Sequence, residues 1–212
     1  NHSNSRLNPL AHFSHKEVTL EKIRDSQIIA DPLNLFDCSP ISDGAAAAVV
    51  SRDKKGDRDV TIIGSALATD HISLAHRRVH TSLEAAKKAS KEAYDQARVS
   101  AKDLDIIEVH DCFTINELVA MEDLGICRPG ESSGWVREQR TTIKGDVPIN
   151  TDGGLKADGH PIGATGLAQV FEVVTQLRGE AGARQVEKAK IGLTHNIGGV
   201  GGTAAVHIFE RN

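Results

Sequence analysis

The chain has 212 residues, of which 39% are hydrophobic and 25% charged, and its formal net charge is −4. This length allows a sizeable core, and the charge gives no reason to expect nucleic acid or a membrane surface as a partner. Three cysteines without CxxC spacing and the lack of a long apolar run argue against a disulfide framework, a zinc ribbon and a membrane span, and favour a cytoplasmic enzyme.

Polar residues dominate 1–30, which carry one short helical pattern and are expected to pack on another segment. Small residues fill DCSPISDGAAAAVVS at 37–51, a composition that suits a buried strand or a tight helix. A charged connection at 53–59 leads into VTIIGSALA at 60–68, which is typical of a buried strand. We therefore expect the main domain to begin near residue 59.

An amphipathic helix is predicted over 81–100, where Thr81 and Glu84 have the spacing of a capping box. Strands and helices then follow, with strands at 103–110, 189–196 and 203–210 and helices at 114–126 and 163–179. The last two strands have the pattern of a hairpin. This order predicts an α/β layered domain with a mixed sheet.

Three short motifs lie at the ends of the predicted strands, where α/β folds commonly place their chemistry. The first is HDCF at 110–113, directly after an apolar strand, and its His110 and Cys112 alternate along the chain, so that both can face one side. The same residues also suit a packed cysteine beside a hydrogen-bonded histidine, with Asp111 capping the next helix. The tetrapeptide alone leaves both interpretations open.

The second motif, GGLKADGHPIGATG at 153–166, holds His160 among glycines and then turns into a helix. Glycines permit close approach to a ligand and a helix start favours negative charge, although a plain chain reversal also fits. The third motif, HNIGGVGG at 195–202, indicates either a glycine hairpin or a set of backbone N–H groups for an oxyanion site. Because His110, Cys112 and His160 lack the usual spacing of zinc ligands, no metal is expected.

In this order, HDCF, GGLKADGHPIGATG and HNIGGVGG resemble the C-terminal part of a thiolase of the sterol-carrier-protein-2-like branch, which is common in archaea. The resemblance spans nearly the whole chain, including SDGAAAAVV, INTDGGL and QLRGEAGARQV. It implies reversible Claisen chemistry on acyl-coenzyme A thioesters such as acetoacetyl-CoA, without a further cofactor, on a layered fold with a mixed five-stranded sheet. It also implies a loop-domain remnant at 1–30, the end of an N-terminal domain at 31–58 and a C-terminal domain at 59–212.

The resemblance also implies a division of roles. His160 resembles the histidine that takes the proton of a nucleophilic cysteine, and His110 stands where most thiolases have an asparagine that helps to polarise the enolate. Cys112 resembles the acid/base cysteine of this branch, with a thiol pKa lowered by His110 or His160. Asn196 stands where other thiolases carry that cysteine. The other implied positions are the backbone of Gly198, Gly199 and Gly201 for a second oxyanion hole, and Phe113, Gly159 and Pro161 for substrate binding.

No segment resembles the surroundings of the nucleophilic cysteine, which thiolases carry in their N-terminal half. We therefore expect the chain alone to be inactive, as a fragment, as one subunit of a split enzyme or as a non-catalytic assembly module. A thiolase-like aldolase acting on β-hydroxyacyl-CoA is a further alternative, although such relatives replace the histidine of GHP. The expected partners are acyl-CoA or CoA, an N-terminal half or a small OB-fold protein, and further copies of the chain in a dimer or tetramer.

Overall fold

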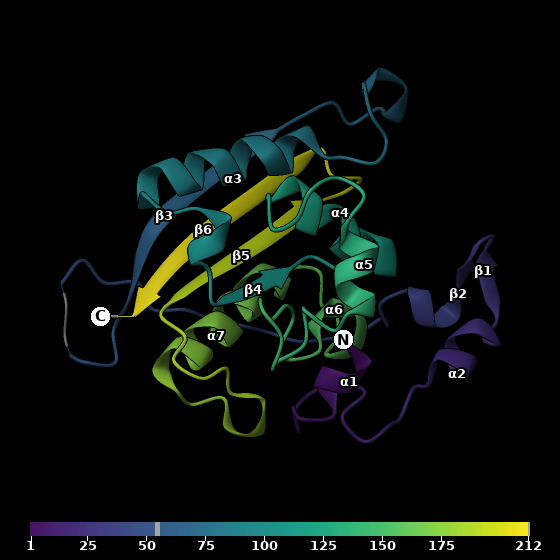
Figure 1. Ribbon diagram of the computed structural model, residues 1–212, viewed down its shortest axis with the longest axis horizontal. Helices are drawn as coiled ribbons and strands as arrows, with labels where there is room; N and C mark the ends of the chain where they lie inside the picture. The colour runs from purple at the N-terminus through teal and green to yellow at the C-terminus, as the bar shows by residue number, and fades with distance from the viewer. Residues whose placement is uncertain (54–55, 212) are drawn as a thin grey trace.

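A four-stranded mixed sheet forms the centre of the computed structural model, which describes residues 1–53 and 56–211 (Figure 1). In spatial order the strands are β3 (Val60–Thr69), β6 (Thr203–Arg211), β5 (Ile191–Gly198) and β4 (Ile106–Val109). Strand β6 runs antiparallel to both β3 and β5, whereas β4 and β5 are parallel. The predicted α/β class, mixed sheet and closing hairpin are confirmed.

The five-stranded sheet that the resemblance implied has four strands among the described residues. Residues 147–149 lie beside β4, in the place of a fifth strand, but form an isolated bridge between Ile149 and Ile107. Ile107 donates its N–H to Pro148 O (3.0 Å), and Asn150 N–H donates to Ile107 O (2.9 Å). Because Pro148 has no N–H of its own, a longer ladder does not form at this edge.

Helices cover both faces of the sheet (Figure 1). Helix α3 (Glu84–Ala97) packs on β3 and β6, and α7 (Thr165–Arg178) packs against β4 and β5. The alanines on the buried side of α3 have no exposed surface, namely Ala85, Ala86, Ala89 and Ala93. Gly64 of β3 permits this close packing, because a Cβ there would lie 2.4 Å from Ala93 O. No helix in the described ranges is long and apolar enough to cross a bilayer.

The start of α3 differs from the prediction. Thr81 and Glu84 form no capping box; the helix begins after Leu83, whose N–H donates to Asp123 Oδ2 (2.7 Å). Asp123 is the last residue of α4 (Thr114–Asp123), so the cap comes from a neighbouring helix. A carboxylate is favoured at this place by the positive end of the helix dipole. The contact therefore ties α3 to α4.

The N-terminal arm packs against the segment that precedes His160. Helix α1 (His2–Ser5) contacts α6 (Gly154–Ala157), and Asn4 Nδ2 donates to Asn150 O (3.0 Å). The arm thus leans on another segment, as its composition predicted. The remaining helices and strands are α2 (Leu20–Arg24), β1 (Ile28–Ala30), β2 (Leu33–Asn34) and α5 (Ser132–Arg137).

Residues 39–50 form neither the buried strand nor the tight helix that their composition favoured. Val49 is 97% exposed and Val50 78%. One end of the segment contacts the His160 loop, where a Cβ on Gly44 would lie 2.9 Å from Pro161. Among the described residues no strand is paired with this segment, and most of its side chains remain exposed.

Candidate active site

The carboxyl end of β4 places His110 in the interior of the molecule. Asn150 fixes this strand end, because its Oδ1 accepts the Val109 N–H (2.8 Å). His110 is 7% exposed. Burial, followed by smaller contributions from His160 and His195, lowers the pKa of His110 to about 3. His110 is therefore a neutral imidazole at physiological pH.

Asp111 links the HDCF motif to the segment that carries His160. Its Oδ1 accepts the Leu155 N–H (2.7 Å) and its Oδ2 accepts the Lys156 N–H (3.4 Å), both in α6. Gly154 has a φ of 62°, and a Cβ there would lie 2.6 Å from Asp111 Oδ2, so this contact requires glycine. Asp111 therefore joins two motifs rather than capping the next helix.

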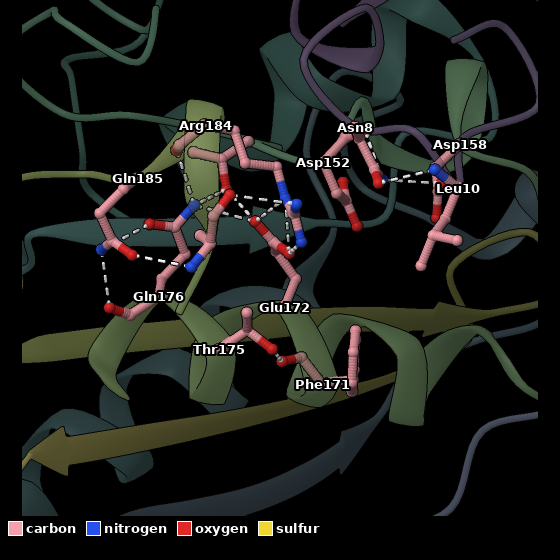
Figure 2. A network of polar contacts seen from close by, with 12 residues as sticks. Asn8, Leu10, Asp152, Asp158, Phe171, Glu172, Thr175, Gln176, Arg184 and Gln185 are labelled. Carbon is pink, nitrogen blue, oxygen red and sulfur yellow. Dashed lines mark hydrogen bonds and ion pairs between the residues drawn. The ribbon is translucent and has the colours of Figure 1, made fainter. Parts of the chain in front are cut away.

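A buried ionic network supports the same segment from α7 (Figure 2). Arg184 Nη2 lies 2.7 Å from Glu172 Oε2, and the Thr151 hydroxyl donates to Glu172 Oε1 (2.7 Å). Burial, and then the charge of Glu172, raise the pKa of Asp152 well above its usual range and that of Asp158 to about 6. These contacts hold the residues that lead into the GHP loop.

The GHP loop presents His160 in one defined tautomer. The backbone N–H of His160 donates to Ser42 Oγ (2.8 Å), and its Nδ1 lies 2.8 Å from Thr165 Oγ1. Because the Thr165 hydroxyl donates its single hydrogen to Pro161 O (3.0 Å), it accepts from His160, which places the ring proton on Nδ1. Burial lowers the pKa of His160. The Nε2 lone pair is therefore available to a proton donor.

The structure brings His110, His160 and Asn196 together. The rings of His110 and His160 are 5.0 Å apart and nearly perpendicular. Asn196 Nδ2 lies 3.1 Å from His110 Nδ1. The amide nitrogen can only donate, so His110 Nδ1 accepts and its ring proton is on Nε2. The two histidines therefore carry their protons on opposite ring nitrogens.

The side chain of Cys112 contacts α4. Its Sγ accepts from Asn116 Nδ2 (3.1 Å). Burial, followed by the charge of Asp111, raises the pKa of the Cys112 thiol, so the lowered pKa that we expected is wrong. The reason is that His110 and His160 are both held neutral, so neither supplies a cation to stabilise a thiolate. Cys112 is a protonated thiol at neutral pH.

The glycines of HNIGGVGG form the turn between β5 and β6. Gly201 N–H donates to Gly198 O (3.0 Å), so this N–H already has a partner within the turn. Gly199 has a φ of 57°, which glycine adopts without strain. The assignment of Gly198, Gly199 and Gly201 to a second oxyanion hole remains a prediction.

An open hollow of about 670 Å³ lies in front of His160, between residues 39–46 and 160–164. Pro161 lines it, and a Cβ on Gly159 would lie 2.9 Å from Ser42 Oγ. Phe113, 38% exposed, precedes α4 and is not among the described residues that line the hollow. His160 and Pro161 therefore line the same hollow. The substrate roles of Phe113, Gly159 and Pro161 remain predictions.

Known proteins are similar in sequence to most of this chain. A family model described as "Thiolase C-terminal domain-like" matches residues 66–211, which is most of the chain. The chain belongs to the thiolase family. Over 215 residues this thiolase is 52% identical to an acetyl-CoA acetyltransferase of Methanothermobacter thermautotrophicus, with 100% of this chain and 56% of the relative covered.

Two further similarities connect this thiolase to eukaryotic proteins and to a solved structure. It is 40% identical to rat sterol carrier protein 2, covering 99% of this chain and 40% of the relative. The structure titled "Ltp2-ChsH2(DUF35) aldolase" superposes with a TM-score of 0.85 at 22% identity, covering 99% of this chain and 56% of that one, which shows a shared fold. The resemblance seen in the sequence is confirmed, and this thiolase spans about half the length, or less, of these proteins.

Sequence reasoning missed the polar residues of α7 that support the site. Thr165 contacts His160, and Gln169, one helical turn later, accepts from Asn196 Nδ2 (3.1 Å). Gln169 is 3% exposed. The hydrophobic pattern of α7 places Gln169 on the buried side of the helix, which indicates that its side chain has a hydrogen-bond partner. The pattern does not identify that partner.

Replacing His195 with leucine is expected to make this thiolase less sensitive to acid. His195 is 1% exposed, neither ring nitrogen has a hydrogen-bond partner in the part of the chain that the structure describes, and burial lowers its pKa to about 4. At a pH below the ordinary histidine pKa, His195 is protonated in the unfolded chain but remains neutral in the folded chain. The free energy of unfolding therefore falls between pH of about 6.5 and about 4, by up to about 3 kcal/mol.

Urea unfolding of the wild type and of His195→Leu, at pH of about 7 and about 4.5, measures this difference. The variant should lose less stability on acidification than the wild type, whereas the exposed His12→Leu should behave as the wild type does. An equal loss in His195→Leu would contradict the assignment of this acid sensitivity to His195.

Proposed function

We propose that this thiolase chain performs reversible condensation and thiolysis of 3-ketoacyl-CoA, such as acetoacetyl-CoA, with a nucleophilic cysteine supplied by an N-terminal half. The observation that carries the proposal is the pair of neutral histidines with rings 5.0 Å apart and protons on opposite nitrogens. His160 offers a lone pair to a proton, and His110 offers an Nε2–H to an oxygen. A base beside a hydrogen-bond donor serves both acylation and enolate formation.

In the thiolysis direction the steps balance as follows. His160 Nε2 takes the proton of the cysteine thiol, and the thiolate attacks the 3-keto carbon of the substrate. The C2–C3 bond then breaks, which leaves an acyl group on the cysteine and the enolate of acetyl-CoA. His110 Nε2–H donates to the enolate oxygen, and the Cys112 thiol protonates the enolate carbon. The proton held by His160 then returns to the Cys112 thiolate. His160 next takes the proton of the CoA thiol, the CoA thiolate attacks the acyl-enzyme, and the departing cysteine sulfur takes that proton back from His160, which restores every group.

The raised pKa of Cys112 supports its part in this scheme. A thiol that remains protonated at neutral pH is ready to give its proton to the enolate in cleavage. In the condensation direction the same group has to lose its proton before it can remove one from acetyl-CoA. The protonated thiol of the resting site is therefore the form of Cys112 that the cleavage direction uses.

Exposed apolar side chains support an N-terminal half as the partner. On α7, Leu167 is 43% exposed and Phe171 57%, and both lie on the side that faces away from the sheet. Val49 and Val50 in the unpaired segment add to this apolar surface. Burial of these groups by the missing part of the enzyme would stabilise the complex. The small OB-fold protein and the dimer or tetramer remain predictions.

The proposal is tested by supplying the missing half. The chain is coexpressed with the N-terminal part of the 52%-identical archaeal acetyl-CoA acetyltransferase that the present chain does not cover. CoA-dependent cleavage of acetoacetyl-CoA should appear in the complex and in neither part alone. A complex in which His160→Ala replaces the wild-type chain is the matched control and should be inactive.

The same experiment separates the alternatives. Cleavage of a β-hydroxyacyl-CoA without any acyl-enzyme, and no cleavage of 3-ketoacyl-CoA, would indicate an aldolase instead. A stable complex with neither activity would indicate a non-catalytic assembly module. Either result would overturn the proposed thiolase reaction.

A further inference from the structure

A chain of three amide hydrogen bonds leads from the backbone of β5 to the ring of His110. Gln169 Nε2 donates to His195 O (3.1 Å), and Asn196 Nδ2 donates to Gln169 Oε1 (3.1 Å). Asn196 Nδ2 also lies 3.1 Å from His110 Nδ1. Gln169 is 3% exposed and its bond to His195 O is buried, so water does not compete for that bond.

The donor and the acceptor of each hydrogen bond in this series follow from the first bond, between Gln169 and His195 O. The carbonyl oxygen of His195 can only accept, so the amide nitrogen of Gln169 must face it, and Gln169 Oε1 must face Asn196. That oxygen can also only accept, so Asn196 must present its amide nitrogen. The second hydrogen on this nitrogen points to His110 Nδ1, which must carry a lone pair.

We infer that Gln169 is a positioning residue that sets the tautomer of His110 through Asn196. The inference rests on the proposed function, in which His110 donates through Nε2–H. A neutral imidazole has one ring proton, so a ring protonated on Nδ1 would turn a lone pair toward the enolate oxygen and repel it. Gln169 thus determines whether His110 Nε2 presents a hydrogen-bond donor or an acceptor to the enolate oxygen.

The same helix sets the tautomer of the other histidine. Thr165 and Gln169 are four residues apart in α7, so they lie on one side of the helix, one turn from each other. Thr165 accepts from His160 and leaves its Nε2 free as a base, whereas Gln169 acts through Asn196 and leaves His110 Nε2 protonated. Two residues one turn apart in α7 therefore make His160 a base and His110 a hydrogen-bond donor.

The tautomer can be read directly by NMR on the present chain labelled with ¹⁵N-histidine, through correlations between ring hydrogens and ring nitrogens. The wild type should show His110 with a protonated Nε2 and an unprotonated Nδ1. In Gln169→Met, Asn196 loses its acceptor and can turn its oxygen to the ring, so the Nδ1-protonated form should appear. Thr175→Ala is the control, because Thr175 lies in the same helix and its hydroxyl donates to Phe171 O, outside this series of hydrogen bonds, so it should leave His110 unchanged.

A second variant keeps the test decisive if Gln169→Met does not fold. Asn196→Asp is nearly isosteric and presents an acceptor to His110 Nδ1, so it should move the proton to that nitrogen. Protonated Nδ1 in the wild type would overturn the inference, as would an unchanged His110 signal in both Gln169→Met and Asn196→Asp.

Activity adds a readout that distinguishes this inference from the proposed function. In the complex with an N-terminal half, Gln169→Met should lower kcat for condensation at least about tenfold while acyl transfer is retained, since only the enolate step uses His110. If the complex has no thiolase activity, the NMR result still decides the tautomer. If it is active but the His110 signals are those of the wild type in every variant, the function stands and the positioning role fails.

Discussion

Replacing His160 with alanine is expected to abolish both acyl transfer and condensation in the complete enzyme. His160 is the group in this site whose Nε2 is unprotonated and free to take the proton of a cysteine thiol. Without it the nucleophile remains a thiol, which is a weak nucleophile at neutral pH, and the loss should be about 10²- to 10⁴-fold in each half-reaction. Exchange of labelled CoA into acetyl-CoA measures the first half-reaction, and formation of acetoacetyl-CoA measures the second.

His207→Ala is the matched control for this experiment. His207 is a half-buried histidine on β6, bonded to Ser65, and it lies outside the proposed site. Intact mass spectrometry after incubation with acetyl-CoA should detect an acyl-enzyme in the control and none in His160→Ala. An undiminished acyl-enzyme in His160→Ala would assign the activation of the nucleophile to another residue.

The elements that local sequence determines were predicted, and those that depend on distant partners were not. Strands β4, β5 and β6 each carry apolar residues within a short segment bounded by polar or glycine-containing turns, and this local pattern sufficed to predict them. The cap of α3 was predicted wrongly, because the spacing of Thr81 and Glu84 is local whereas Asp123, which binds the helix start, is 40 residues away. Residues 39–50 have the composition of a buried segment, but burial requires a neighbour that composition does not specify.

The motif residues of the candidate site could be predicted from the sequence, but their protonation states could not. His110, His160 and Asn196 were found from the motifs that contain them, and the structure places all three together. Their protonation could not be predicted, because the pKa of His110 depends on burial and its tautomer depends on hydrogen bonds from another helix. The pKa of Cys112 was predicted in the wrong direction for the same reason, since a histidine lowers a thiol pKa only when it is itself charged.

Replacing Cys112 with alanine is expected to separate the two half-reactions. Acyl transfer does not use the Cys112 thiol and should be retained, whereas proton transfer to and from the α-carbon should fall by about 10²-fold or more. Exchange of the acetyl-CoA methyl hydrogens with deuterium from the solvent reports that proton transfer without the rest of the reaction. Cys38→Ala is the matched control, because Cys38 is another half-buried free cysteine and should leave both steps intact.

The pH dependence of the wild type provides a second test of the same assignment. Since burial and Asp111 raise the pKa of Cys112, the thiol that protonates the enolate in cleavage should persist into the alkaline range. Condensation requires the deprotonated form, so its rate should rise with pH up to that raised pKa, and this rise should be absent from Cys112→Ala. Equal loss of acyl transfer and of α-proton exchange in Cys112→Ala would remove the division of labour between Cys112 and His160.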